Sequence, residues 1–389
     1  MKRLGALALA TTAVLLVLIV PSLAVGHPAA AAGTSGPTPL SAPTAAAPPS
    51  AVFTMTNNAT ANSVVAYRIG TGGALIPAGT FSTHARGTGA SLADQAALAL
   101  TRDHRWLLVV DAGSNEISVF HVNAPSPTHP LLTLTDHAFS GGVLPVSLAV
   151  HGSLVYVLND GNSTVAGNIA GFLLSSTGRL FPLAGSHRPL STTGATGGAQ
   201  IAFNPGGSVL VVTEKATSLL DTYHVGPLGY ASAPSFTNSS GSTPYGFAFT
   251  RAGTLVVSEA GPGALSSYTV SGAGATVVSG TVLDNQSAPC WVAVAEGGQY
   301  AFTTNAHSNS ISTYQVASNG TLTLQASIGA TTGAAPTDMA VTTSTGHYLL
   351  VYDAGASEID EFALGAGGSL TEIASVYGLG ATAEGLVAF

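Results

Sequence analysis

The chain has 389 residues, of which 46% are hydrophobic and 7% are charged, and this composition excludes a disordered chain solvated by its charges. The 47 glycines and 21 prolines favour short strands joined by tight turns over long helices. A net charge of −8 leaves no basic stripe for phosphate groups, so we expect no nucleic-acid partner.

The N-terminus is typical of an export signal. Lys2 and Arg3 precede an apolar run over residues 4–20, and Pro21 and several small residues follow it. We therefore predict a signal peptide over residues 1–24 and a secreted, extracytoplasmic protein. The alternative is an uncleaved anchor, because the run is just long enough to cross a bilayer, and this would be the only membrane contact.

Residues 25–50 consist mainly of Ala, Pro, Ser, Thr and Gly, which predicts a flexible linker. Cys290 is the only cysteine, so the chain can form no intrachain disulfide and has no lipidation cysteine after the apolar run.

From residue 51 onward one pattern recurs, in which a short apolar run ends in a polar residue. The seven polar residues, called the anchors below, are Asn57, Asp111, Asn159, Glu214, Glu259, Asn305 and Asp353. Their spacing of 45 to 55 residues is typical of a β-propeller. We predict an all-β fold over residues 51–389: a seven-bladed β-propeller of four-stranded antiparallel blades.

The sixth repeat shows the four expected strands of a blade. They are residues 289–294 as the inner strand, 300–304 as the second, 311–316 as the third and 322–327 as the fourth. The first repeat begins at Val52 with its second strand, whereas the chain ends in the inner-strand pattern EGLVAF, residues 384–389. We therefore expect the C-terminal strand to close the ring.

The repeated segments VLNDGNS, FTTNAHSNSISTYQV and APTDMAV resemble those of the seven-bladed lactonase-type propellers, which include 6-phosphogluconolactonase and carboxymuconate-cyclizing enzymes. The resemblance covers about residues 51–389, and together with the N-terminal signal it implies an exported member of that family. It does not settle the reaction, because propellers host many functions.

Glu214 and Glu259 are the anchors that break the pattern. Asn and Asp at the other five positions are expected to close the following turn with their own side chains, for which Glu is too long. We therefore interpret Glu214 and Glu259 as catalytic carboxylates at the mouth of a central channel, against the alternative that both are turn variants. Pairing across the hairpin places Glu214 opposite Gly198.

Further polar residues are expected at the same mouth as substrate-binding groups. Lys215, the only lysine beyond the signal segment, and Arg188 could hold a carboxylate or phosphate, although each could also be an ordinary surface residue. The inner-strand candidates are Gln95, Ser147, Gln200 and Asp338.

The family resemblance implies a His, an Arg and a Glu that serve lactone chemistry. Glu214 matches the family Glu, but Ala199 and Gln200 stand where Arg and His are expected. Gln200 cannot shuttle protons, so the family mechanism does not carry over intact.

No pair of histidines has metal-ligand spacing, and no phosphate-binding or dinucleotide-binding motif occurs, so we predict no metal and no cofactor. A cation held in the channel by carbonyl and carboxylate oxygens stays open as an alternative. Cys290 and its neighbour Trp291 are expected in the core. Two functions stay open. One is an exported hydrolase acting on a sugar-acid lactone, and the other is a non-catalytic propeller that binds a saccharide, a cell-envelope component or a protein. In both cases we expect a monomer.

Overall fold

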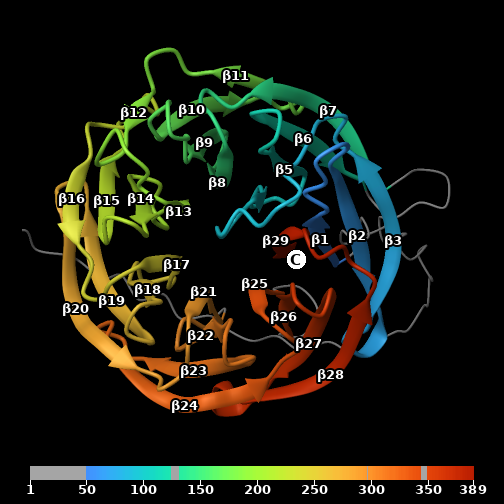
Figure 1. Ribbon diagram of the computed structural model, residues 1–389, viewed down its shortest axis with the longest axis vertical. Helices are drawn as coiled ribbons and strands as arrows, with labels where there is room; N and C mark the ends of the chain where they lie inside the picture. Colours follow the sequence, from blue (N-terminus) through green and yellow to red (C-terminus); the bar gives the residue numbers. More distant parts are fainter. Residues whose placement is uncertain (1–49, 124–130, 296, 343–347) are drawn as a thin grey trace, which may run out of the picture. The chain divides into compact units, whose positions relative to one another are not determined.

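The computed structural model describes residues 50–123, 131–295, 297–342 and 348–389. Within these residues seven antiparallel sheets follow one another around a common axis, so the predicted seven-bladed β-propeller is confirmed (Figure 1). The predicted signal peptide (residues 1–24) and nearly all of the linker lie outside the described residues. None of the described residues belongs to a helix long and apolar enough to cross a membrane.

Each blade has four strands, counted from the axis outward. The inner strands are β29 (Glu384–Ala388), β4 (Leu98–Leu100), β8 (Pro145–His151), β13 (Gly198–Phe203), β17 (Pro244–Phe249), β21 (Pro289–Val294) and β25 (Pro336–Val341). The second strands are β1 (Ala51–Met55), β5 (Trp106–Asp111), β9 (Leu154–Asn159), β14 (Val209–Glu214), β18 (Leu255–Glu259), β22 (Tyr300–Asn305) and β26 (Tyr348–Asp353).

The two outer positions complete the blades. The third strands are β2 (Ser63–Ile69), β6 (Glu116–Val122), β10 (Asn168–Leu174), β15 (Leu219–His224), β19 (Ala264–Ser271), β23 (Ser310–Val316) and β27 (Glu358–Leu364). The fourth strands are β3 (Leu75–Ser82), β7 (Leu132–Phe139), β11 (Leu180–Pro182), β16 (Ser235–Asn238), β20 (Gly274–Leu283), β24 (Leu322–Thr331) and β28 (Leu370–Tyr377). A short strand β12 (Arg188–Pro189) also pairs with β10, and the 3-10 turns are η1 (Thr71–Gly73) and η2 (Ala366–Gly368).

Burial explains the sequence pattern of the strands. The second strands β5 and β14 are buried from end to end, because both of their faces pack against other parts of the propeller, and each therefore forms a nearly continuous apolar run. Most residues of an outer strand such as β3 are exposed or half-buried, since one side of it meets solvent. The sixth blade follows its prediction closely, except that β24 continues four residues further.

The C-terminal strand closes the ring as predicted. Strand β29 pairs antiparallel with β1, and Phe389 exchanges backbone hydrogen bonds of 3.1 and 3.2 Å with Ala51. The buried ring of Phe389 also stacks on His104 of the second blade, with 4.5 Å between the ring centroids. The last residues therefore complete the first blade and hold it to the second, and the chain ends close to the propeller axis (Figure 1).

Candidate functional site at the propeller axis

Asp111 is an anchor that bonds both to its own blade and to the neighbouring one. Its Oδ2 accepts a hydrogen bond of 2.7 Å from the Ser118 hydroxyl in the third strand, and its Oδ1 accepts one of 2.9 Å from Asn62 of the first blade. Asn159 donates to the Ser140 carbonyl in the connection between two blades. The expectation that these side chains close their own turns is wrong for Asp111 and Asn159, because their partners belong to other strands and connections.

Glu214 occupies the same kind of position in the fourth blade. It lies opposite Gly198, as predicted, and it is fully buried. Its carboxylate accepts hydrogen bonds from the backbone N–H of Ser191 at 2.8 Å, from the Ser191 hydroxyl, and from the Thr217 hydroxyl at 2.5 Å. Burial, together with the neighbouring charge of Glu214, raises the pKa of Asp221 to about 9. The surroundings of Glu214 are therefore those of a buried contact between blades.

Glu259 has equivalent surroundings in the fifth blade. Its Oε1 accepts hydrogen bonds from the hydroxyls of Ser239 at 2.6 Å, Ser266 at 2.5 Å and Tyr268 at 3.1 Å. Its Oε2 has no partner, and burial raises the pKa of the carboxyl. Glu259 and Glu214 thus lie in separate interblade contacts and do not form a common site.

Lys215, directly after Glu214, faces the propeller axis. Its ammonium group donates to the carbonyl of Ala93 at 2.6 Å and to that of Gly198 at 3.2 Å, and it lies 4.9 Å from the centre of the Tyr245 ring. Partial burial lowers the pKa of Lys215, while nearby carboxylates oppose this effect. The lysine is therefore part of a central cluster.

The partner of Lys215 belongs to a segment, residues 91–97, that occupies the propeller axis and is called the central segment below. Its hydrogen bonds reach four different blades. They join Leu92 N to Glu384 Oε1 at 2.9 Å, Ala96 O to Leu148 N at 2.9 Å, Gln95 N to Ala199 O at 3.0 Å, and Asp94 O to Trp291 Nε1 at 2.5 Å. The centre of the ring, where an open mouth was expected, is crossed by the chain itself.

Gln95 fastens the central segment to the sixth blade. Its side chain bonds to both backbone groups of Val292, with 2.8 Å from Nε2 to the carbonyl oxygen and 3.0 Å from the amide nitrogen to Oε1. Gly246 makes room for this contact, because a Cβ atom there would lie 2.0 Å from the Gln95 Oε1. Gln95 therefore acts as a structural bridge in this conformation.

Three buried carboxyl groups lie together at the axis: Asp94 belongs to the central segment, whereas Asp338 and Glu384 come from the inner strands β25 and β29. Asp94 is fully buried and neither of its oxygens has a hydrogen-bond partner, so burial and the charges of Glu384 and Asp338 raise its pKa well above the usual range. Burial likewise raises the pKa of Asp338 well above its usual range, and that of Glu384 to about 7. Asp160 contributes a fourth, partly buried carboxyl that accepts from Gly198 N at 2.6 Å.

The remaining inner-strand candidates join adjacent blades. The Ser147 hydroxyl donates to the Gln95 carbonyl at 2.6 Å and accepts from Ile201 N at 3.1 Å. The Oε1 of Gln200 accepts from Phe247 N at 2.6 Å. These side chains line the ring of inner strands, but the Ser147 hydroxyl and the Gln200 Oε1 are occupied by backbone groups.

Arg188 lies on the outer side of the third blade. It is part of β12, pairs with Ile169 of the third strand, and donates to the carbonyls of Ser232, Gly185 and His187. The structure therefore does not bring Arg188 to Lys215. Cys290 and Trp291 are buried, as predicted, and burial raises the pKa of the Cys290 thiol to about 12.

Asp94, Asp160 and Glu384 were not predicted as site residues. Asp160 and Lys215 each follow an anchor directly, at a position that is Ala in the second, fifth, sixth and seventh repeats, and this contrast could have singled them out. Glu384 was visible only as the first residue of the closing strand, and nothing local marks Asp94.

Together these groups could polarise and deprotonate a bound molecule. Glu384 can hold or release a proton near neutral pH, and Lys215 supplies the positive charge that stabilises a developing oxyanion. The fold and this cluster define a class of protein, a seven-bladed propeller with acidic groups and a single lysine gathered at its axis.

Comparison with known proteins places the chain in a family. The sequence profile of the lactonase family, described as a seven-bladed β-propeller, matches residues 50–168 and 256–382, together more than half of the chain. The chain therefore belongs to the lactonase family of seven-bladed β-propellers. Among curated proteins, none matches it.

Solved structures with the same fold share little sequence with this chain. A periplasmic gluconolactonase from Pseudomonas aeruginosa is 16% identical, with a TM-score of 0.67 over 87% of this chain and 99% of that one. A candidate 6-phosphogluconolactonase from Bacteroides fragilis is 17% identical, with a TM-score of 0.68 over 89% and 99%. A protein from Lactobacillus plantarum is 15% identical, with a TM-score of 0.71 over 88% and 99%. At such identities the likeness shows the fold alone.

Proposed function

We propose that this protein hydrolyses a lactone of the sugar-acid type at the propeller axis, with Glu384 as the base and Lys215 as the group that stabilises negative charge. The observation that carries the proposal is Glu384 itself, a buried carboxyl of pKa about 7 in an electrostatic cluster with the lysine. Membership of the lactonase family supports the reaction class, and the export-type N-terminal sequence supports an extracytoplasmic site of action.

In the proposed reaction Glu384 removes a proton from water as the oxygen bonds to the lactone carbonyl carbon. Lys215 stabilises the resulting oxyanion, the ring C–O bond breaks, and the proton passes from Glu384 to the leaving oxygen to give the open hydroxy acid. For substrate to reach Glu384, the hydrogen bond from Leu92 N must open.

The test is hydrolysis of a panel of sugar-acid and simple lactones by the purified protein. Glu384→Gln should lower kcat by about 100-fold or more, because general-base catalysis contributes that much. For the wild type, kcat should rise with pH through about 7, as the carboxyl loses its proton. Glu372→Gln, on an exposed outer strand, is the matched control and should change neither.

The same assay tests the carboxylates proposed from the sequence. Should Glu214→Gln or Glu259→Gln abolish hydrolysis while Glu384→Gln retains it, the reaction belongs to those residues and the assignment of Glu384 is wrong.

A second candidate function is binding without turnover, of a saccharide, a cell-envelope component or a protein. The central segment favours it, because residues 91–97 bond to four blades and cover the acidic groups. This reading predicts no hydrolysis of any lactone by the wild type, together with saturable binding of a saccharide or envelope polymer. Lactone turnover that depends on Glu384 would rule it out.

A further inference from the structure

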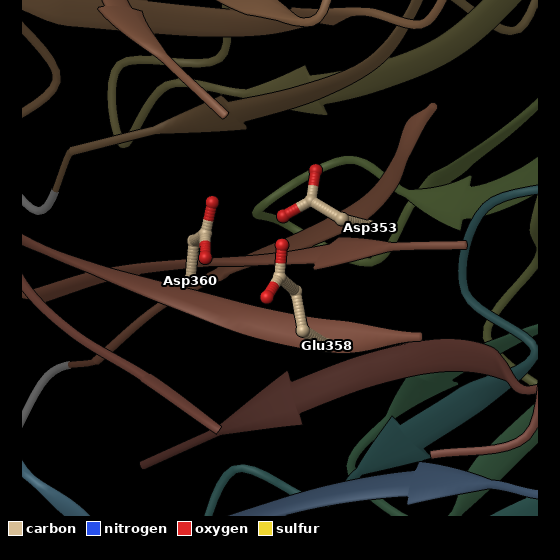
Figure 2. A group of neighbouring side chains, drawn as sticks. All are labelled: Asp353, Glu358 and Asp360. Carbon is tan, nitrogen blue, oxygen red and sulfur yellow. The ribbon is translucent and has the colours of Figure 1, made fainter. Parts of the chain in front are cut away.

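The seventh blade contains a cluster of three buried carboxylates that includes none of the residues described at the axis. Asp353 ends β26, its paired residue Glu358 begins β27, and Asp360 follows two residues later. One oxygen from each carboxylate lies within 4.8 Å of one oxygen from each of the others. Figure 2 shows the three carboxylates turned toward one another.

Asp353 is the feature that ordinary packing does not explain. Its side chain is fully buried, yet neither of its oxygens accepts a hydrogen bond. The nearby Thr332 hydroxyl donates instead to the Gly333 carbonyl at 2.9 Å, and the Gly333 N–H donates to Asp360 at 3.0 Å. Among the described residues the only ion pair joins His137 and Glu116, so no basic side chain neutralises the cluster.

The second blade shows what an equivalent position looks like when it is satisfied. There Asp111 pairs with Glu116 as Asp353 pairs with Glu358, but Ser118 stands where the seventh blade has Asp360. The Ser118 hydroxyl donates to Asp111. In the seventh blade this donor is replaced by a third carboxylate, which can only accept when ionised.

Three carboxylates this close repel one another, so the cluster must take up either protons or a cation. Only oxygen ligands are present, which suits a hard divalent ion, and calcium tolerates irregular geometry better than magnesium does.

The local backbone leaves room for such an arrangement. Gly333 lies against the cluster, and a Cβ atom there would come within 2.1 Å of the Glu358 Oε1. Tyr377, the strand partner of Glu358, is 71% exposed, so the cluster lies beneath the surface at an accessible edge.

From this geometry we propose that Asp353, Glu358 and Asp360 bind a divalent cation, calcium by preference, which ties the second and third strands of the seventh blade together. The cation would be structural, and the proposal is independent of the reaction at the axis. No sequence motif marks this site, because its ligands come from two strands and include no histidine.

The experiment uses the complete purified chain after chelation. Terbium, a calcium analogue, should bind with a single saturable luminescence signal excited through tyrosine, and calcium should displace it. Calcium at about 100 times its Kd should raise Tm by about 4 °C for a propeller of this size.

Asp360→Ser copies the arrangement of the second blade and should abolish both responses while the protein stays folded. Asp353→Asn is the second variant and should do the same, whereas Asp111→Asn, the matched change in the second blade, should leave them intact. Absence of saturable terbium binding, or binding that survives Asp360→Ser and Asp353→Asn, would overturn the proposal. A Tm that responds to pH but not to calcium would also overturn it, because the cluster then holds protons.

Discussion

At the end of β14, two adjacent residues have opposite surroundings. Glu214 points into the contact between blades and bonds to Ser191 and Thr217, whereas Lys215 reaches the central segment. Successive side chains of an extended chain point to opposite sides, so a shift of one position decides which residue can meet a ligand. The unusual sequence Thr213-Glu214-Lys215 therefore places the glutamate in a contact between blades and the lysine at the propeller axis.

Gly246 allows a prediction at the scale of one residue. Gly246→Ala should destabilise the protein by about 1 to 3 kcal/mol, because the new methyl group would displace the Gln95 side chain from Val292. Gly280→Ala is the matched control, since its Cβ would meet nothing within 4 Å in the strand β20, and it should be neutral or slightly stabilising. Urea unfolding measures both, and equal stability of the two variants would contradict the role of Gly246.

Strand β29 carries the prediction at the scale of one element. Deleting residues 384–389 should lower Tm strongly and cause aggregation, because it removes the inner strand of the first blade and exposes the edge of β1. Differential scanning calorimetry and size-exclusion chromatography measure the two effects.

The deletion also removes Glu384, so a milder variant is needed to test ring closure alone. Phe389→Ala keeps the strand but removes a buried ring, and it should cost about 3 to 5 kcal/mol. A truncated protein that stays monomeric with an unchanged Tm would show that the ring does not depend on β29.

For the whole molecule, the buried acids predict how stability depends on pH. The folded-state pKa values are raised to about 9 for Asp221 and Asp353 and to about 7 for Glu384. The folded protein therefore binds more protons than the unfolded chain between about pH 4 and 9, so stability should fall as pH rises through that range. The lowered pKa of Lys215 acts in the opposite direction but involves one group.

Thermal unfolding at pH 5, 7 and 9 in the presence of a chelator checks this dependence. Tm should be highest at pH 5 and lowest at pH 9, and a Tm that rises over this interval would contradict the protonated state of these acids.

Much of the fold could be predicted from local patterns. The number and spacing of the anchors predicted seven blades. The missing inner strand before Val52 predicted closure by residues 384–389, and pairing across the hairpin placed Glu214 opposite Gly198. These features depend on strand periodicity and turn residues within one repeat, which neighbouring amino acids determine.

The arrangement at the axis was decided only by the tertiary structure. Gln95 bonds to Val292, which lies 197 residues away, and Glu384 meets the central segment only because the chain end returns to the first blade. The lack of a hydrogen-bond donor for Asp353 likewise depends on which side chain of the neighbouring strand β27 faces it. Such contacts join distant parts of the chain and follow from packing of the blades around one axis, so no local pattern in the sequence specifies them.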